Sequence, residues 1–279
     1  MKKFQIALND TLETRLLATS MLVNIAYLKY PSIKRPCKEE YDCIKYAKIF
    51  HGVVAKYEKL PDVLSDDFID NVDIEKTKYF FDHSNYPIIS IHIGDNLKNL
   101  SDEECIENAI KNIEFIKDAL KNPYRDILVA LENMEILSNL NTLNPYFIKR
   151  LIKATNCKFL LDTAHATIAA HLLNMNVYDY VTELPLEDVV EIHFSGTAYD
   201  GDYILSHIKA REEDYELLEY VLNIANPDVI TIEYGLYDTH YKRDILNTLP
   251  KVSYSQINIT ALNEILYMYY RVDKLRQKN

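Results

Sequence analysis

Glycine is scarce in this chain, and the glycine-rich loops of nucleotide-binding proteins are absent. Only 5 of the 279 residues are glycine, and neither a GxGxxG nor a GxxxxGK[ST] pattern occurs. Nucleotide-binding loops use glycines so that the backbone can approach a phosphate closely. The familiar kinds of phosphate-cradling loop are therefore excluded.

Long apolar stretches and closely spaced cysteines are also missing. No run of about 18 apolar residues occurs, and the N-terminal MKKFQIALND lacks the apolar core of a signal peptide. The four cysteines (Cys37, Cys43, Cys105 and Cys157) show no CxxC spacing, so ordinary thiols are expected rather than disulfides or zinc ligands. We expect a soluble, cytoplasmic protein with no membrane partner.

Basic residues are in deficit. The chain has 31 basic and 42 acidic residues, and its formal charge of −11 repels phosphate backbones and anionic membranes. Nucleic acid is therefore not expected as a partner. No linker rich in proline, glycine or serine divides the chain, so residues 1–279 predict a single domain.

Short apolar runs alternate with amphipathic helical stretches. Such alternation is typical of parallel βαβ units, and the length suits a (β/α)8 TIM barrel, an α/β fold of roughly 250 residues. Seven strands are expected, at residues 4–8, 52–60, 87–94, 126–133, 158–165, 189–196 and 229–235. The eighth strand is expected at residues 22–31 or 252–259, which leaves one irregular strand. Residues 10–50 are interpreted as an irregular loop and helix region packed on the barrel.

Polar side chains that can bind a metal stand at the ends of five successive predicted strands. They are His92, Glu132, Asp162 with His165, His193, and Glu233. Parallel barrels gather the carboxyl ends of their strands at one mouth, where barrel enzymes place their active sites. Buried carboxylates and imidazoles need compensation, and Zn, Mn or Fe ions supply it. The pattern therefore predicts a metal site.

Each of these residues also has a structural interpretation when it is taken singly. A lone strand-end histidine is more often hydrogen-bonded than metal-bound, Glu132 and Glu233 could pair with basic residues, and Asp162 could cap the following helix. The coincidence at corresponding strand ends favours the metal. Four other histidines lack this placement and are not assigned to the site: His51, His83, His171 and His240.

Four motifs, in this order and spacing, resemble those of a known superfamily. They are ALEN at 130–133, LLDTAHATIAA at 160–170, EIHFSG at 191–196 and TIEYG at 231–235. The set is similar to that of the xylose-isomerase-like TIM barrels, and most similar to that of the multinuclear non-heme iron-dependent oxidases. The resemblance implies two or three irons, O2 as oxidant, and oxidation of cysteine or another residue in a ribosomally made precursor peptide. It also implies a possible separate peptide-binding partner protein.

The resemblance also implies roles for individual residues. His92 would bind one iron, and Glu132 would bridge to its neighbour. Asp162, His193 and Glu233 would complete a second centre, and His165 with His207 would point toward a third. Glu132, Asp162, His193 and Glu233 are the expected catalytic residues.

The chain departs from that family at two places. Leu205 stands where an aspartate is expected in the loop before His207, and Asp200 or Asp202 could substitute for it as a third-metal ligand. The family's early histidine, near the end of the second strand, has no counterpart in the predicted strand at 52–60. Glu58 could be a replacement ligand there, although a solvated charge is the plainer interpretation.

Three alternatives remain open from the sequence. A sugar isomerase or epimerase would use one Mn or similar ion to polarise a carbonyl while carboxylates move protons. An endonuclease IV-like hydrolase would use a zinc cluster to activate water, although the negative charge opposes it. A degenerate barrel would bind a peptide or a partner without chemistry.

Overall fold

The computed structural model describes residues 3–31, 36–57, 60–135, 139–200, 203–235 and 256–278. None of the helices in these ranges carries an apolar stretch long enough to cross a lipid bilayer.

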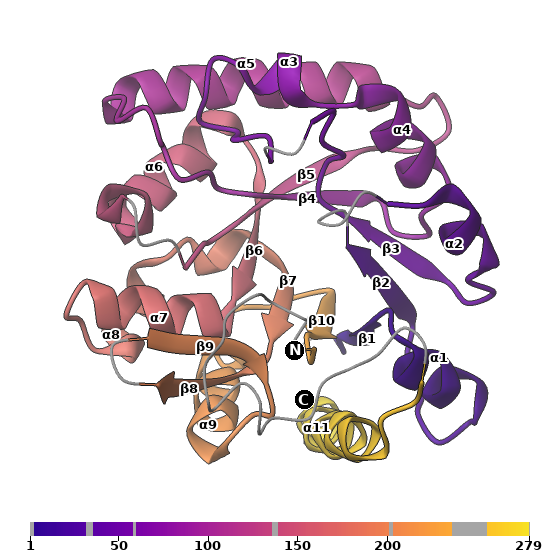
Figure 1. Cartoon of the computed structure of the whole chain (residues 1–279). Coiled ribbons are helices and arrows are strands. Elements are labelled where there is room, and N and C mark those ends of the chain that lie inside the picture. The colour runs from indigo at the N-terminus through magenta and orange to yellow at the C-terminus, as the bar shows by residue number, and fades with distance from the viewer. Residues whose placement is uncertain are drawn as a thin grey trace.

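Eight parallel strands form the barrel, as the sequence predicts (Figure 1). Neighbouring strands are paired in the order β3-β2-β1-β10-β7-β6-β5-β4. Their bounds are β1 Gln5–Asn9, β2 Tyr27–Pro31, β3 Lys48–His51, β4 Ile88–His92, β5 Leu128–Glu132, β6 Lys158–Asp162, β7 Val189–Phe194 and β10 Val229–Ile232. The connecting helices lie around the outside of the strands, which places all of the strand carboxyl ends at one mouth.

The barrel is nearly closed, with an irregular seam between β3 and β4. These two strands stand at the ends of the strand order. The Gly52 backbone amide donates a 2.9 Å hydrogen bond to the Ser90 carbonyl across this seam. The predicted TIM barrel is thus confirmed, and its irregularity is this seam beside the first part of the chain.

The interpretation of residues 10–50 and of the predicted strand at 52–60 was wrong. Residues 10–50 contain two barrel strands, β2 and β3, together with α1 Leu12–Thr19 and α2 Lys38–Cys43. Strand β2 lies within one of the two segments predicted to supply the eighth strand. The apolar residues at 53–54 follow β3 as a loop. Val54 is buried against α4, Ile74–Asp82, and its amide donates a 2.9 Å hydrogen bond to the Thr77 hydroxyl. Burial in a loop therefore produced a strand-like pattern.

Helices and short 3-10 segments complete the barrel. Helix α5, Asp102–Leu120, is one of the expected amphipathic helices, and its capping box joins Ser101 to Glu104. Its buried face includes Ile113 and Ile116. The remaining elements are α3 Phe68–Asn71, α4 Ile74–Asp82, α5 Asp102–Leu120, η1 Leu140–Leu143, α6 Pro145–Thr155, α7 Thr163–Leu172, α8 Val177–Glu183, η2 Leu186–Asp188, α9 Glu212–Leu222 and α11 Ile259–Lys278.

A two-stranded antiparallel hairpin follows β7 at the mouth. It consists of β8 Gly196–Asp200 and β9 Tyr203–Ile208, and it carries His207. The His207 amide donates to the Ser195 hydroxyl at 3.2 Å, and the Gly235 amide donates to the His207 carbonyl at 3.0 Å. These bonds connect the hairpin to the ends of β7 and β10.

Gly196 fixes the base of this hairpin because it has no side chain. A Cβ at this position would lie 2.2 Å from the Lys209 carbonyl oxygen. Backbone cannot be relieved by a rotamer change, so we expect Gly196→Ala to destabilise the protein by about 2 kcal/mol. Thermal unfolding should show a midpoint lowered by about 5 °C. An unchanged midpoint would show that the hairpin can shift freely.

Candidate metal centre

The barrel brings the predicted strand-end residues to one level at its mouth. His92 is the register partner of Glu132 between β4 and β5, and Asp162 is the partner of His193 between β6 and β7. Glu233 comes directly after β10. Because neighbouring strands are paired in register, these side chains converge without any loop rearrangement.

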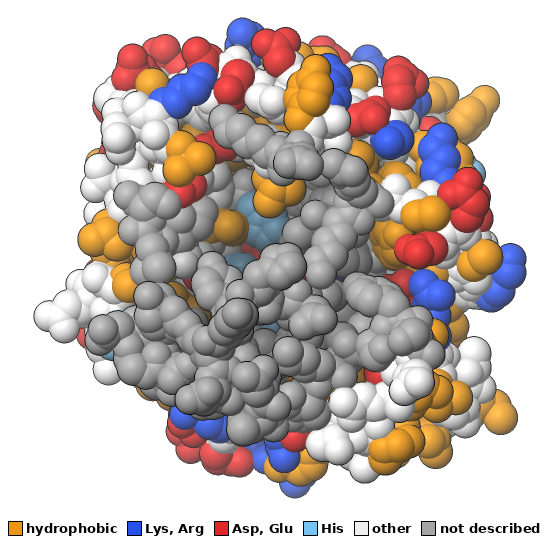
Figure 2. Space-filling view, viewed as in Figure 1, with side chains coloured by type: hydrophobic (Ala, Val, Ile, Leu, Met, Phe, Trp, Pro, Cys, Tyr) orange, Lys and Arg blue, Asp and Glu red, His pale blue; other side chains and the backbone are white. Residues whose placement is uncertain are grey.

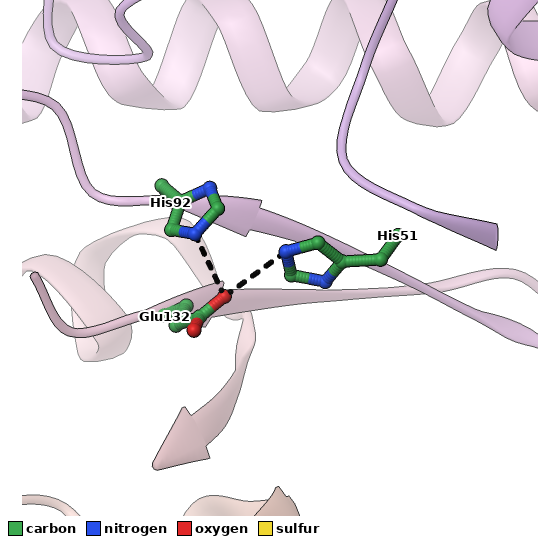
Figure 3. Close-up of side chains that lie close together, drawn as sticks. All are labelled: His51, His92 and Glu132. Atoms are coloured by element: carbon green, nitrogen blue, oxygen red, sulfur yellow. Dashed lines mark ion pairs between the residues drawn. The ribbon is translucent and has the colours of Figure 1, made fainter. Parts of the chain in front are cut away.

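Glu132 is the central carboxylate. Its Oε2 lies 3.3 Å from Nε2 of His51 and 3.3 Å from Nε2 of His92 (Figure 3). Its Oε1 lies 3.0 Å from Nδ1 of His193. Both carboxylate oxygens are therefore close to imidazole nitrogens, which is the arrangement that a bridging ligand requires.

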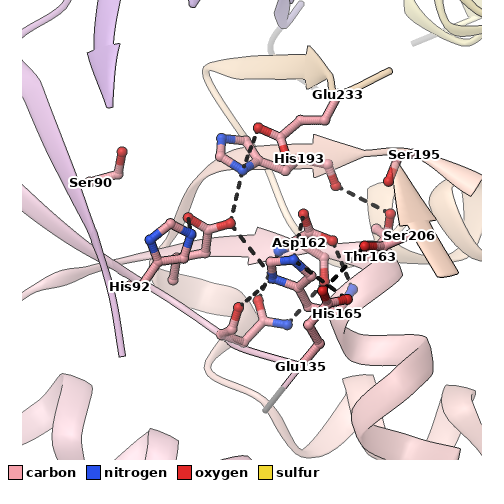
Figure 4. Close-up of polar contacts among 12 residues, drawn as sticks. Ser90, His92, Glu135, Asp162, Thr163, His165, His193, Ser195, Ser206 and Glu233 are labelled. Atoms are coloured by element: carbon pink, nitrogen blue, oxygen red, sulfur yellow. Dashed lines mark hydrogen bonds and ion pairs between the residues drawn. The ribbon is translucent and has the colours of Figure 1, made fainter. Parts of the chain in front are cut away.

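Asp162 and His165 hold a second part of the centre (Figure 4). Asp162 does cap α7, since its Oδ1 accepts a 2.8 Å hydrogen bond from the His165 amide. The other oxygen, Oδ2, lies 3.7 Å from Nε2 of His165. The His165 Nδ1 is 2.9 Å from the Asn133 carbonyl, and this contact orients Nε2 toward the centre. The capping and the ligand interpretations of Asp162 therefore apply to different oxygens of one carboxylate.

His207 and Glu233 approach the centre from the hairpin and from β10. The Nε2 of His207 is 3.0 Å from Oε2 of Glu233, and Nδ1 of His193 is 3.3 Å from Oε1 of Glu233. His207 has a φ of 60°, in the left-handed region. This conformation at a non-glycine residue costs energy and is held by the backbone contacts of the hairpin.

Three overlapping sets of ligand atoms have the spacing of a metal site. Within each set, the atoms lie within 4.8 Å of one another. The sets are His51 with His92 and Glu132, Glu132 with Asp162 and His193, and Asp162 with His165 and His207. The predicted residues are thus brought together, and Glu233 contacts two of them from outside these sets.

His51 belongs to the centre, so its exclusion on the basis of the sequence was wrong. It is the last residue of β3 and is 2 % exposed. Its Nδ1 contacts the Ser90 hydroxyl, which orients Nε2 toward Glu132. His51 was not assigned to the site from the sequence because the strand was placed at 52–60, just beyond it. The run KIFH, which ends in histidine, is the signal that could have identified it.

The other residues considered from the sequence fall elsewhere. His83 and His171 are exposed, whereas Glu58, Asp202 and His240 lie outside the described residues. Leu205 lies in β9, two residues before His207, and carries no ligand atom.

Lys29 was also missed, and it lies inside the centre. It comes from the middle of β2, is 2 % exposed, and forms an ion pair with Glu233. Its amine is also 3.4 Å from Nε2 of His193. The sequence does not indicate that Lys29 is buried at the centre, because YLKYP has the pattern of a short, partly exposed strand.

Three buried carboxylate oxygens make the centre suitable for a metal. Within the described part of the chain, Oε2 of Glu132, Oδ2 of Asp162 and Oε2 of Glu135 accept no hydrogen bond. Buried acceptors without a partner are costly, and a divalent ion would satisfy them. The oxygen and imidazole donors suit iron, and they also suit manganese or zinc.

The electrostatics favour neutral imidazole ligands. Burial lowers the pKa of His92 to about 3 and that of His207 to about 4, and it lowers the pKa of His51 and His193 well below the usual value. Neutral imidazole is the form that binds metal. Burial raises the pKa of Glu132 to about 8. The carboxylate is therefore costly to ionise without a nearby cation.

His165 differs from the other histidines of the centre. Burial lowers its pKa, but the carboxylates of Asp162, Glu135 and Glu132 outweigh burial and raise the pKa to about 9. The metal-free protein therefore holds a proton on His165 and one on Glu132 near neutral pH. Both protons must leave before these groups can bind a metal.

We therefore expect metal binding to release protons. Below pH 8, binding should release about two protons, and affinity should rise with pH until about 9. Calorimetric titration of the metal-free protein in two buffers of different ionisation enthalpy measures the release. Identical binding enthalpies in the two buffers would contradict this expectation.

A cavity opens directly above the centre. It has a volume of about 470 Å³, and His51, His92, His165 and His207 line it together with Glu135. Figure 2 shows this hollow, with histidine at its floor and hydrophobic side chains at its rim. The apolar lining residues are Val53, Leu60, Pro61, Ile91, Ile93, Leu97 and Met134. The cavity can hold an amino acid side chain above the histidines.

Solved structures confirm the fold. The chain is similar to a D-tagatose 3-epimerase-like protein, with 15% identity, 99% coverage of both chains and a TM-score of 0.62. It is also similar to a xylose isomerase domain-containing protein from Salmonella typhimurium LT2, with 13% identity and a TM-score of 0.63, covering 99% of this chain and 98% of the other. At these identities the likeness shows a xylose-isomerase-like TIM barrel and nothing about activity.

Sequence comparisons identify the family. A protein of Paraburkholderia phytofirmans described as "UPF0276 protein" is 28% identical over 114 residues, which cover 40% of this chain and 33% of the relative. The match thus spans about a third of that relative's length. Residues 45–243 match the family profile of "RiPP precursor modification enzyme MbnB/TglH/ChrH". These residues include every side chain of the centre except Lys29, and the chain therefore belongs to this family of RiPP precursor modification enzymes.

Proposed function

We propose that the protein is an iron-dependent oxidative enzyme that modifies a residue, foremost cysteine, of a ribosomally made precursor peptide with O2. The observation that carries the proposal is a set of buried carboxylate oxygens that accept no hydrogen bond from the described residues. These oxygens face neutral imidazoles at the base of a cavity. Membership in a family of RiPP precursor modification enzymes supports a peptide as the substrate.

The residues have two overlapping roles, which are to hold metal and to act on the substrate, and Glu132 and Asp162 have both. His51, His92 and Glu132 would hold one ion, and Asp162, His165 and His207 would hold another. The proposed catalytic set is Glu132, Asp162, His193 and Glu233. The first three form the middle ligand set, between the two ion-holding sets, and Glu233 contacts His193. Iron(II), when bound, supplies electrons for the reduction of O2 and an open position for a thiolate.

The cavity walls would position the peptide. The apolar side chains at its rim would exclude water from the residue being modified. Glu135 lies in the wall, burial raises its pKa, and its Oε2 accepts no hydrogen bond from the described residues. Its carboxylate is placed to accept the proton of an entering thiol. A separate peptide-binding protein would deliver the precursor.

The proposal is tested with protein purified without added metal. We expect it to contain iron, and we expect the iron-loaded protein to change the mass of a cysteine-bearing peptide encoded beside its gene only when O2 is present. The co-encoded peptide-binding protein, if one is present, is added in a parallel reaction. A peptide with cysteine replaced by serine is the matched control. Full activity without iron would overturn the proposal, and protein that binds no metal would favour a degenerate barrel.

A metal-dependent sugar epimerase is the second candidate. It is favoured by the position of Glu132, Asp162, His193 and Glu233 at the ends of four strands. In that case one ion would polarise a carbonyl while two carboxylates move protons. Turnover of a ketose without O2, at one metal per chain, would support this candidate. The formal charge of −11 opposes a nuclease.

A further inference from the structure

Lys29 is a buried cation placed among the ligands of the candidate centre. Its ammonium pairs with Oε1 of Glu233 and lies 3.4 Å from Nε2 of His193. Burial lowers its pKa to about 8, and the nearby carboxylates of Glu132, Glu191 and Asp162 oppose that effect. An ammonium among metal ligands needs an explanation, because it repels the cations that those ligands would bind.

The carboxylates of the centre can balance two divalent ions and one ammonium. Five carboxylates are paired with imidazoles of the centre. Glu132, Asp162, Glu191 and Glu233 are buried, and Glu191 lies 3.3 Å from Nε2 of His193. Glu135, at the cavity wall, lies 3.9 Å from Nε2 of His165. These five carboxylates carry five negative charges when ionised. Two divalent ions and Lys29 supply five positive charges, whereas three divalent ions and Lys29 would supply two more than the carboxylates balance.

The arrangement of the ligand sets also indicates two metal ions. The two outer sets, His51 with His92 and Glu132, and Asp162 with His165 and His207, share no residue. The middle set takes both of its carboxylates from the outer sets, and its remaining ligand is His193.

The carboxylate that could complete the middle set is Glu233. It contacts His193 at 3.3 Å, but it is paired with Lys29. Strand β9, which carries His207, has Leu205 two residues before it, and leucine supplies no further carboxylate to the donors.

We propose that Lys29 takes the place of a third metal ion, so that the centre holds two ions and Glu233 is neutralised by the ammonium. The inference rests on the metal centre of the proposed function. It deepens that function, because it assigns the charge of the third cation to the protein itself. A centre of this kind contains one cation that neither chelators nor oxidants can remove.

The test is a titration of metal-free protein with Co(II), followed by visible absorption and elemental analysis. The wild-type protein should bind two equivalents. Lys29→Met removes the charge while keeping a side chain of similar length, and it should bind three. The matched double variant, Lys29→Met with Glu233→Gln, removes both charges and should bind two.

The outcomes separate the two proposals. Three equivalents in the wild-type protein, or two in Lys29→Met, would overturn the role of Lys29 and leave the proposed function intact. No metal in the wild-type protein would overturn both. If Lys29→Met does not fold, a crystal structure of the Co(II)-loaded wild-type protein decides the question. Glu233 bonded to Lys29 and free of metal supports the inference, and Glu233 bound to cobalt overturns it.

Discussion

Glu132→Gln should abolish metal binding by the outer set that contains His51 and His92, and should lower peptide modification about 1000-fold or more. Glu132 is 1 % exposed and lies within 4 Å of four imidazoles, and it is the only carboxylate in the set with His51 and His92 among the described residues. An amide is neutral and its nitrogen cannot bind a metal, and several kcal/mol of metal stabilisation convert to about a thousandfold in rate. Elemental analysis and mass spectrometry of the peptide measure the two effects.

Glu114→Gln is the control for this experiment. Glu114 is exposed on α5, far along the chain from any strand end. The same charge is removed, yet metal content and activity should stay at the wild-type level. If Glu132→Gln keeps its full metal content, Glu132 is a structural acceptor for histidines and the bridging role is wrong.

His51→Asn should remove one of the two ions and reduce peptide modification to background. His51 is buried and its Nε2 lies 3.3 Å from Glu132, so its loss leaves His92 and Glu132 as the only described residues of that set. The side-chain amide of asparagine can replace Nδ1 of His51 in the hydrogen bond with the Ser90 hydroxyl. It has no counterpart of Nε2, so the nitrogen ligand is lost. Metal stoichiometry and product formation are the measurements.

His83→Asn is the matched control, because His83 is exposed at the end of α4. It should bind metal and turn over peptide as the wild-type protein does. Should His51→Asn retain both ions with normal folding, the histidine would be a hydrogen-bonded core residue and not a ligand.

Much of the barrel could be predicted from the sequence because its strands are apolar and its helices are amphipathic. Six of the seven predicted strands are barrel strands, and the residues at their carboxyl ends are those that converge. Asp162 illustrates the strength of this inference: a buried strand followed by an aspartate and a helix places a carboxylate at the mouth in any parallel barrel.

The strands in the first part of the chain were harder to predict, for a physical reason. Strands β2 and β3 are five and four residues long, too short for a clear alternation of polar and apolar side chains. Lys29 and His51 face the polar centre of the barrel, so each breaks the apolar pattern that marks a strand. The loop after β3 is more apolar than the strand itself because it packs on α4.

The sequence by itself determined that carboxylates and imidazoles stand at the ends of successive strands, because the spacing of the apolar runs predicts where each strand ends. Only the tertiary structure decided that His51 completes the set and that a lysine shares it. Those facts depend on which strands close the barrel and on distances between side chains from opposite ends of the chain. Neither is encoded in local periodicity, since a pair such as Lys29 and Glu233 meets only after the barrel has formed.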